Sequence, residues 1–95
     1  DAKRNWQKRF ATSKLNKWLE IKTSEYPPPM LKGRRLRLRY ITQIKSRPPN
    51  FLIFSSSLDV PKNYRRFLLN NIREQFNLKN IPIRLKFKVG NNPYV

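Results

Sequence analysis

The stretch GRRLRLRY, Gly33 to Tyr40, alternates arginine with apolar residues, and IPIRLKFKV, Ile81 to Val89, repeats this alternation with mixed cations. A side-chain period of two is typical of a β-strand that has one buried and one exposed face. The pattern therefore predicts two strands, the first over about Arg35 to Lys45, with apolar residues turned inward and cations turned outward. The predicted inward residues are Leu36, Leu38 and Tyr40, then Ile83, Leu85, Phe87 and Val89. The predicted outward cations are Arg35, Arg37 and Arg39, then Arg84, Lys86 and Lys88.

Three further elements are predicted between and before these strands. FLIF, Phe51 to Phe54, is apolar on both faces and favours a central strand. TSKLNKWLEIK predicts a helix that Thr12 or Ser13 caps, and the segment Pro61 to Phe76 predicts the clearest helix of the chain. The order is helix, strand, strand, helix, strand, and a right-handed crossover would make the last two strands parallel. The predicted fold class is α+β, with one three-stranded mixed sheet packed on helices.

The second predicted helix also carries cations. Arg65, Arg66 and Arg73 lie mostly off its apolar stripe. Two interpretations stay open for them, an ordinary solvated helix surface and a ridge that contacts phosphates.

Charge gives the strongest indication of a partner. The chain has 95 residues, with 22 Lys and Arg against five Asp and Glu, which gives a formal net charge of +17. This length predicts one domain with a thin core, and the charge favours a polyanionic partner such as RNA.

Composition also excludes several kinds of chemistry. The chain has neither cysteine nor histidine, and its few carboxylates are scattered along the sequence. We therefore expect no catalytic residues and no metal site. The longest apolar run is too short for a membrane span, so we expect no membrane partner.

A nucleotide site is not expected either. The chain has only two glycines, Gly33 and Gly90, which cannot supply a G-x-x-x-x-G-K-[ST] phosphate loop. Ser55 to Ser57 is interpreted as a polar turn. We expect no cofactor within this chain.

Several segments together resemble a known family. They are TSKLNKWL, KGRRLRLRYITQIKSRPPNFLIF and YRRFLLNNIREQFNLKNIPIRLKFK, with NPY near the end. They are similar to the carboxy-terminal KH-like domain of the Der (EngA) family, bacterial GTPases with two G domains in tandem. The resemblance covers roughly Arg9 to Tyr94. The residues at the family's spacing are Tyr40, Thr42, Gln43, Pro48, Pro49, Phe51, Phe54, Tyr64, Arg66, Leu68, Asn70, Arg73, Phe76, Pro82 and Ile83.

The resemblance implies a KH-like fold and a role in assembly of the large (50S) ribosomal subunit. It implies that residues 1–10 are the tail of a preceding G domain and that residues 11–95 are the KH-like domain. The implied partners are ribosomal RNA and the protein's own G domains, which would bind GTP and Mg. The implied protein is a cytoplasmic monomer, and the closing GNNPY is similar to alphaproteobacterial members.

Two departures from the family pattern affect these expectations. Asn80 stands where relatives commonly have glycine, which a left-handed backbone would tolerate. The G-x-x-G loop of ordinary KH domains is missing, so binding should depend on basic surface and shape. Two alternatives remain open: the basic sheet face meets the G domains instead of RNA, or the chain is a free-standing basic RNA-binding or ribosomal protein.

Overall fold

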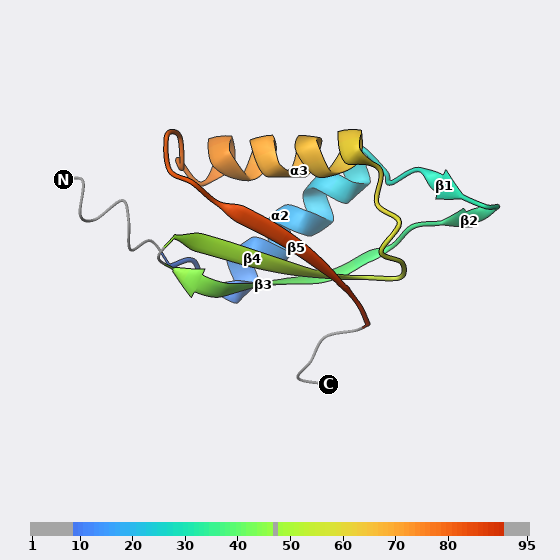
Figure 1. Ribbon diagram of the computed structural model, residues 1–95, viewed down its shortest axis with the longest axis horizontal. Coiled ribbons are helices and arrows are strands. Elements are labelled where there is room, and N and C mark those ends of the chain that lie inside the picture. The colour runs from blue at the N-terminus through green and yellow to red at the C-terminus, as the bar shows by residue number, and fades with distance from the viewer. Residues whose placement is uncertain (1–8, 47, 91–95) are drawn as a thin grey trace.

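The computed structural model describes residues 9–46 and 48–90 and arranges them as a helix layer on a small sheet (Figure 1). In this part of the chain the elements are α2 (Thr12–Glu25), β1 (Met30–Leu31), β2 (Arg34–Arg35), β3 (Leu38–Ser46), β4 (Pro49–Ser55), α3 (Lys62–Gln75) and β5 (Arg84–Val89). The main sheet has the strand order β3-β4-β5. β4 runs antiparallel to β3 and parallel to β5. The predicted α+β fold and the predicted parallel pair are confirmed.

The core lies between the two helices and one face of the sheet. Strand β4 is central, and its Phe51 and Ile53 are fully buried toward the helices. Each helix contributes an apolar stripe at three- and four-residue spacing, which places the stripe on a single side. The buried helix residues are Leu15, Trp18 and Leu19 in α2 and Tyr64, Leu68 and Ile72 in α3. Because both stripes join one cluster with Phe51 and Ile53, both helices cover the same face and leave the other face of the sheet open.

Two predicted details of helices and turns have different outcomes. Helix α2 begins after Ala11, which forms no side-chain cap, so the predicted capping role of Thr12 or Ser13 is wrong. Both residues already lie inside the first turn. Asn80 has a φ of 65°, so the predicted left-handed backbone at this position is confirmed.

The largest correction concerns residues 33–40. Lys32 and Gly33 have φ values of 50° and 79° and form a two-residue turn, which joins β1 to β2 as a separate hairpin. Strand β3 therefore begins at Leu38 and not at Arg35. A two-residue turn with positive φ at both positions favours a tight hairpin, and this local structure removes Arg34 and Arg35 from the main sheet.

A β-bulge also reverses the predicted alternation in β3. Leu38 pairs with Ser55, whereas Tyr40 pairs with Phe54, so β3 advances two residues while β4 advances one. The additional residue moves the following side chains to the other face. Ile41 is fully buried, and Tyr40 lies on the opposite face beside Phe54. The prediction that Leu36, Leu38 and Tyr40 point the same way is therefore wrong for Tyr40.

The start of the described chain packs onto this body. The Phe10 ring lies 4.8 Å from that of Phe76 and 6.4 Å from that of Phe51, measured between centroids. The Phe10 backbone N–H donates to Gln43 Oε1 at 2.8 Å. The predicted boundary after residue 10 stays a prediction, because residues 1–8 lie outside the described residues.

Candidate nucleic-acid interface

Opposite charges are separated between the layers of the molecule. The carboxylates in the described ranges are Glu20, Glu25, Asp59 and Glu74, and all lie on α2, on α3 or in the loop before α3. Every charged residue on the strands is a cation. Among residues 9–46 and 48–90 the ion pair is that of Lys22 with Glu25, at 3.1 Å between Nζ and Oε1. The positive charge of the strands is therefore uncompensated within this part of the chain.

The uncovered side of the main sheet, here called the open sheet face, combines cations with aromatic rings. Directly paired residues share a face, so strand register gives its composition. Its rows across β3, β4 and β5 are Lys45–Asn50–Arg84, Thr42–Leu52–Lys86 and Tyr40–Phe54–Lys88. The three β5 cations are exposed, which confirms their predicted outward orientation. The rings of Tyr40 and Phe54 lie 6.2 Å apart.

On the inner side of β5 the prediction holds only in part. Ile83 is buried, and Leu85 and Phe87 are half-buried against the helix side. Val89 keeps the inward phase of Leu85 and Phe87 in the register, but it is 54 % exposed and does not join the core. Val89 pairs with Ser55 at the end of β4, where the sheet extends beyond the helix layer.

Asn50 is a residue of the open sheet face that the sequence analysis missed. Its side chain is 6 % exposed, and its Oδ1 is buried without a hydrogen-bond partner in the described part of the chain. It lies between Lys45 and Arg84 in register. A buried acceptor without a partner is costly, so this position carries an unmet hydrogen-bonding requirement beneath the cations of the open sheet face. The only available signal was its position two residues before Leu52, in phase with the outward side of β4.

The opening arginines occupy a different surface. Arg35, Arg37 and Arg39 are exposed and line a groove of about 520 Å³ beside Thr23, Ser24, Pro27 and Pro28 at the end of α2. We call this the arginine groove. Arg35 lies in β2, Arg37 precedes β3, and Arg39 is the additional residue of the bulge. The prediction that both outer strands present their basic residues on one face is wrong for the first strand.

The serine triplet supports the backbone of the arginine groove. The Arg37 backbone N–H donates to Ser56 Oγ at 3.0 Å, and the Ser56 N–H donates to the Arg37 carbonyl at 2.9 Å. Ser57 Oγ accepts a hydrogen bond from the Asp59 N–H at 3.1 Å. The interpretation of the triplet as a polar turn holds for Ser56 and Ser57, whereas Ser55 is the buried last residue of β4.

The three arginines of α3 differ in availability. Arg65 donates to the carbonyls of Val60 and Leu58 at 3.1 and 3.3 Å, and its guanidinium carbon lies 5.5 Å from the centre of the Phe87 ring. These two hydrogen bonds of Arg65 fix the loop before α3 against the helix. Arg66 is exposed, whereas Arg73 is half-buried and its Nε has no hydrogen-bond partner in the described ranges. Of the predicted ridge, Arg66 is therefore the arginine most accessible to a ligand.

Other classes of site have little support in the described residues. They contain no group of three or more His, Cys, Asp or Glu side chains that could hold a metal, and none of their helices is long and apolar enough to cross a membrane.

Burial raises the pKa of Tyr64 from 10.0 to about 12. The Tyr64 hydroxyl donates to the Tyr26 carbonyl at 2.7 Å, which links α3 to the end of α2.

Comparison with known proteins gives a consistent set of relatives. Residues 9–88 match the family described as the C-terminal KH-domain-like region of EngA bacterial GTPase enzymes. The chain is 48% identical to GTPase Der of Bartonella tribocorum over 92 residues, which cover 96% of this chain and 19% of the relative. It is 44% identical to GTPase Der of Rhizobium etli over 95 residues, or 99% of this chain and 20% of the relative. The chain thus spans about a fifth of the length of these curated relatives.

Proposed function

Because the chain belongs to the family of C-terminal KH-like domains of the EngA (Der) bacterial GTPases, we propose that it is the RNA-binding, ribosome-facing domain of such an enzyme. The proposed partner is ribosomal RNA of the large (50S) subunit during its assembly. GTP and Mg would be bound by the G domains, which this chain lacks. The proposed protein acts in the cytoplasm as a monomer.

The observation that carries this proposal is the open sheet face. It brings Arg84, Lys86 and Lys88 together in exposed positions, and no carboxylate lies on any described strand. Cations that face solvent without a partner bind phosphates and release counterions. The adjacent Tyr40 is half-buried and adds a ring that can contact bases or riboses.

The positions of the glycines support a surface mode of binding. Gly33 lies in the turn between β1 and β2, and Gly90 follows β5. Neither belongs to a loop that joins two helices, where an ordinary KH domain has its G-x-x-G clamp. We therefore propose recognition of RNA shape and backbone, with weak sequence preference.

The arginine groove favours a second role within the same protein. The arginine groove lies at the end of α2, separate from the open sheet face. Three arginines and two prolines, Pro27 and Pro28, line it. We propose that the G domains dock there while RNA occupies the open sheet face. The alternative of a free-standing RNA-binding or ribosomal protein loses its support, because the matched family is defined as one domain of a larger GTPase.

The test is a salt series with charge-reversal variants of the 95-residue chain. About four phosphate contacts on the open sheet face should give a log-log salt slope near −2.8 to −3.6, at ~0.7–0.9 per phosphate. Lys86→Glu with Lys88→Glu should weaken binding to large-subunit ribosomal RNA fragments at least about tenfold and flatten the slope by about 1.4–1.8. The measurement is RNA affinity at each salt concentration.

A matched variant controls for net charge. Lys32→Glu with Lys79→Glu reverses the same number of lysines, both exposed and both in turns away from the open sheet face. It should lower affinity less and leave the slope nearly unchanged. If both variants behave alike, the open sheet face is not the RNA site. If Arg37→Glu with Arg39→Glu alone flattens the slope, the arginine groove is the RNA site.

A further inference from the structure

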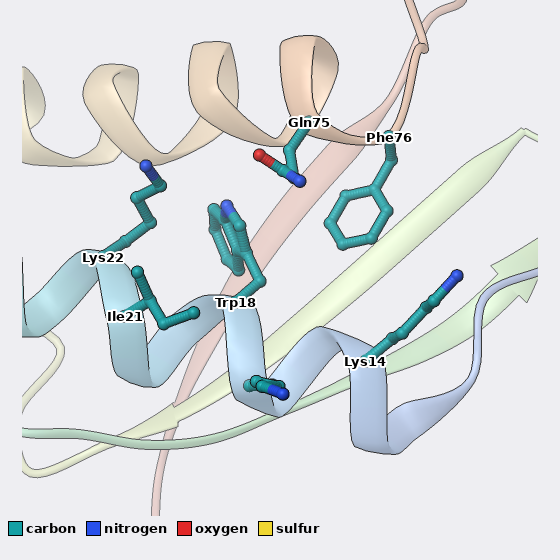
Figure 2. Close-up of a pocket in the computed structure, with 7 residues that line it drawn as sticks. Lys14, Trp18, Ile21, Lys22, Gln75 and Phe76 are labelled. Atoms are coloured by element: carbon teal, nitrogen blue, oxygen red, sulfur yellow. The ribbon is translucent and has the colours of Figure 1, made fainter.

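A pocket outside the surfaces described above lies between α2 and the C-terminal end of α3 (Figure 2). Its volume is about 310 Å³, and its floor consists of Trp18, Ile21 and Phe76. The open sheet face lies on the opposite side of the sheet from this helix layer. We call this pocket between α2 and α3 the lysine-rimmed pocket.

The floor of the pocket is apolar and held in place. The Trp18 indole N–H donates to Asn71 Oδ1 at 2.9 Å, and the Trp18 and Phe76 rings meet edge to face, 6.2 Å apart at 65°. Trp18 is only 5 % exposed, whereas Ile21 is 45 % exposed and Phe76 is half-buried. The apolar surface that a ligand would touch thus comes mainly from Ile21 and Phe76.

The rim of the pocket is cationic. Lys14, Lys17 and Lys22 surround the floor, and no carboxylate lines it. Lys22 pairs with Glu25, while Lys14 and Lys17 have no ion-pair partner among the described residues. The charge favours an anionic ligand that also has an apolar or aromatic part.

Gln75 adds a polar group above the floor. Figure 2 shows its side chain descending from α3 toward Trp18. Within the described ranges its amide makes no hydrogen bond to the protein, so both its donor and its acceptor are available. An amide of this kind can pair with the edge of a nucleobase.

We propose that the lysine-rimmed pocket holds one unstacked base of a single-stranded RNA segment. The base packs against Ile21 and Phe76, Gln75 pairs with its edge, and Lys14 and Lys17 bind the flanking phosphates. The pocket is too small for a peptide helix, whose anchors extend over several turns. This inference rests on the proposed RNA-binding function and adds a second contact site on the helix layer.

Tryptophan fluorescence gives a direct readout. In a Trp6→Phe background the remaining tryptophan is Trp18 at the floor of the pocket. A ten-nucleotide single-stranded RNA of mixed sequence should quench its emission, and a duplex RNA of equal length should bind with little quenching. Ile21→Ser should weaken single-strand binding by about fivefold or more, without weakening duplex binding.

Met30→Ser is the matched control. Met30 is 57 % exposed and lies on β1 of the separate hairpin, so it is an exposed apolar residue like Ile21, but it lines neither the pocket nor the open sheet face. It should leave both affinities unchanged. Ile21 and Met30 are both exposed, so neither substitution should disturb the core. Retained duplex binding then shows that each variant is folded.

Each other outcome overturns the inference. Equal loss of single-strand and duplex binding in Ile21→Ser, or no loss at all, excludes a base in this pocket while leaving the proposed function intact. Failure of the parent chain to bind either RNA overturns the proposed function as well. Quenching by a glutamate-rich amphipathic peptide, but not by RNA, would identify the pocket as a protein-docking site.

Discussion

At the scale of single residues, Asn16 joins α2 to the edge of the sheet. Its Oδ1 accepts from the Ile41 N–H and its Nδ2 donates to the Ile41 carbonyl, both at 2.9 Å. The side chain thus takes the place of a neighbouring strand on this edge of β3, where residues 9–46 and 48–90 supply none. Asn16→Ala should lower the free energy of unfolding by about 2–3 kcal/mol, because two backbone groups lose their partner. Urea unfolding measures this loss, and Asn70→Ala, an exposed change on α3, should cost much less. Equal losses would contradict the role of Asn16.

Tyr64 is the residue whose ionisation should affect stability. Burial raises its pKa from 10.0 to about 12, so the folded protein keeps the hydroxyl proton where the unfolded chain has lost it. The stabilisation is complete below pH 10 and is lost as the pH rises toward 12. Urea unfolding from pH 9 to about 12 should show this decline, and Tyr64→Phe should show a smaller one. A parallel decline in both proteins would mean that the effect does not come from Tyr64.

At the scale of elements, the bulge in β3 decides which side chains form the core. Ile41 is fully buried, whereas Leu38 is only half-buried at the start of the strand. Ile41→Ala should therefore cost about 2–5 kcal/mol of unfolding free energy through a core cavity, and Leu38→Ala less than half as much. Denaturant unfolding of both variants measures the difference. If Leu38→Ala costs as much as Ile41→Ala, the uninterrupted alternation predicted from the sequence is the correct register.

At the scale of the whole molecule, net charge opposes folding. The chain carries +17, and Lys22 with Glu25 is the ion pair found in the described part of the chain. Salt screens this repulsion, so the Tm should rise between about 0.05 and 0.3 M NaCl. The variant with Lys32→Glu and Lys79→Glu should show a smaller rise in thermal denaturation. A Tm that falls with salt would mean that ion pairs, not repulsion, dominate the electrostatics of the fold.

The sequence alone determined the two long helices, the three strands of the main sheet and the class of the fold. Apolar spacing predicted both long helices and the central strand, since burial imposes these periods directly on the residues. The right-handed crossover rule predicted the parallel pairing of β4 with β5. It also predicted the outward cations of β5, because that strand is regular. The family resemblance rested on the same residues and is confirmed.

Only the tertiary structure decided how the basic residues are grouped. The hairpin and the bulge direct Arg35, Arg37 and Arg39 into the arginine groove and leave the open sheet face to β5 and Lys45. An alternating pattern cannot reveal a bulge, because one additional residue reverses the faces without changing the local propensity. The lysine-rimmed pocket likewise exists only because α2 and the end of α3 pack together, and residues so distant in sequence leave no periodic signal of their contact.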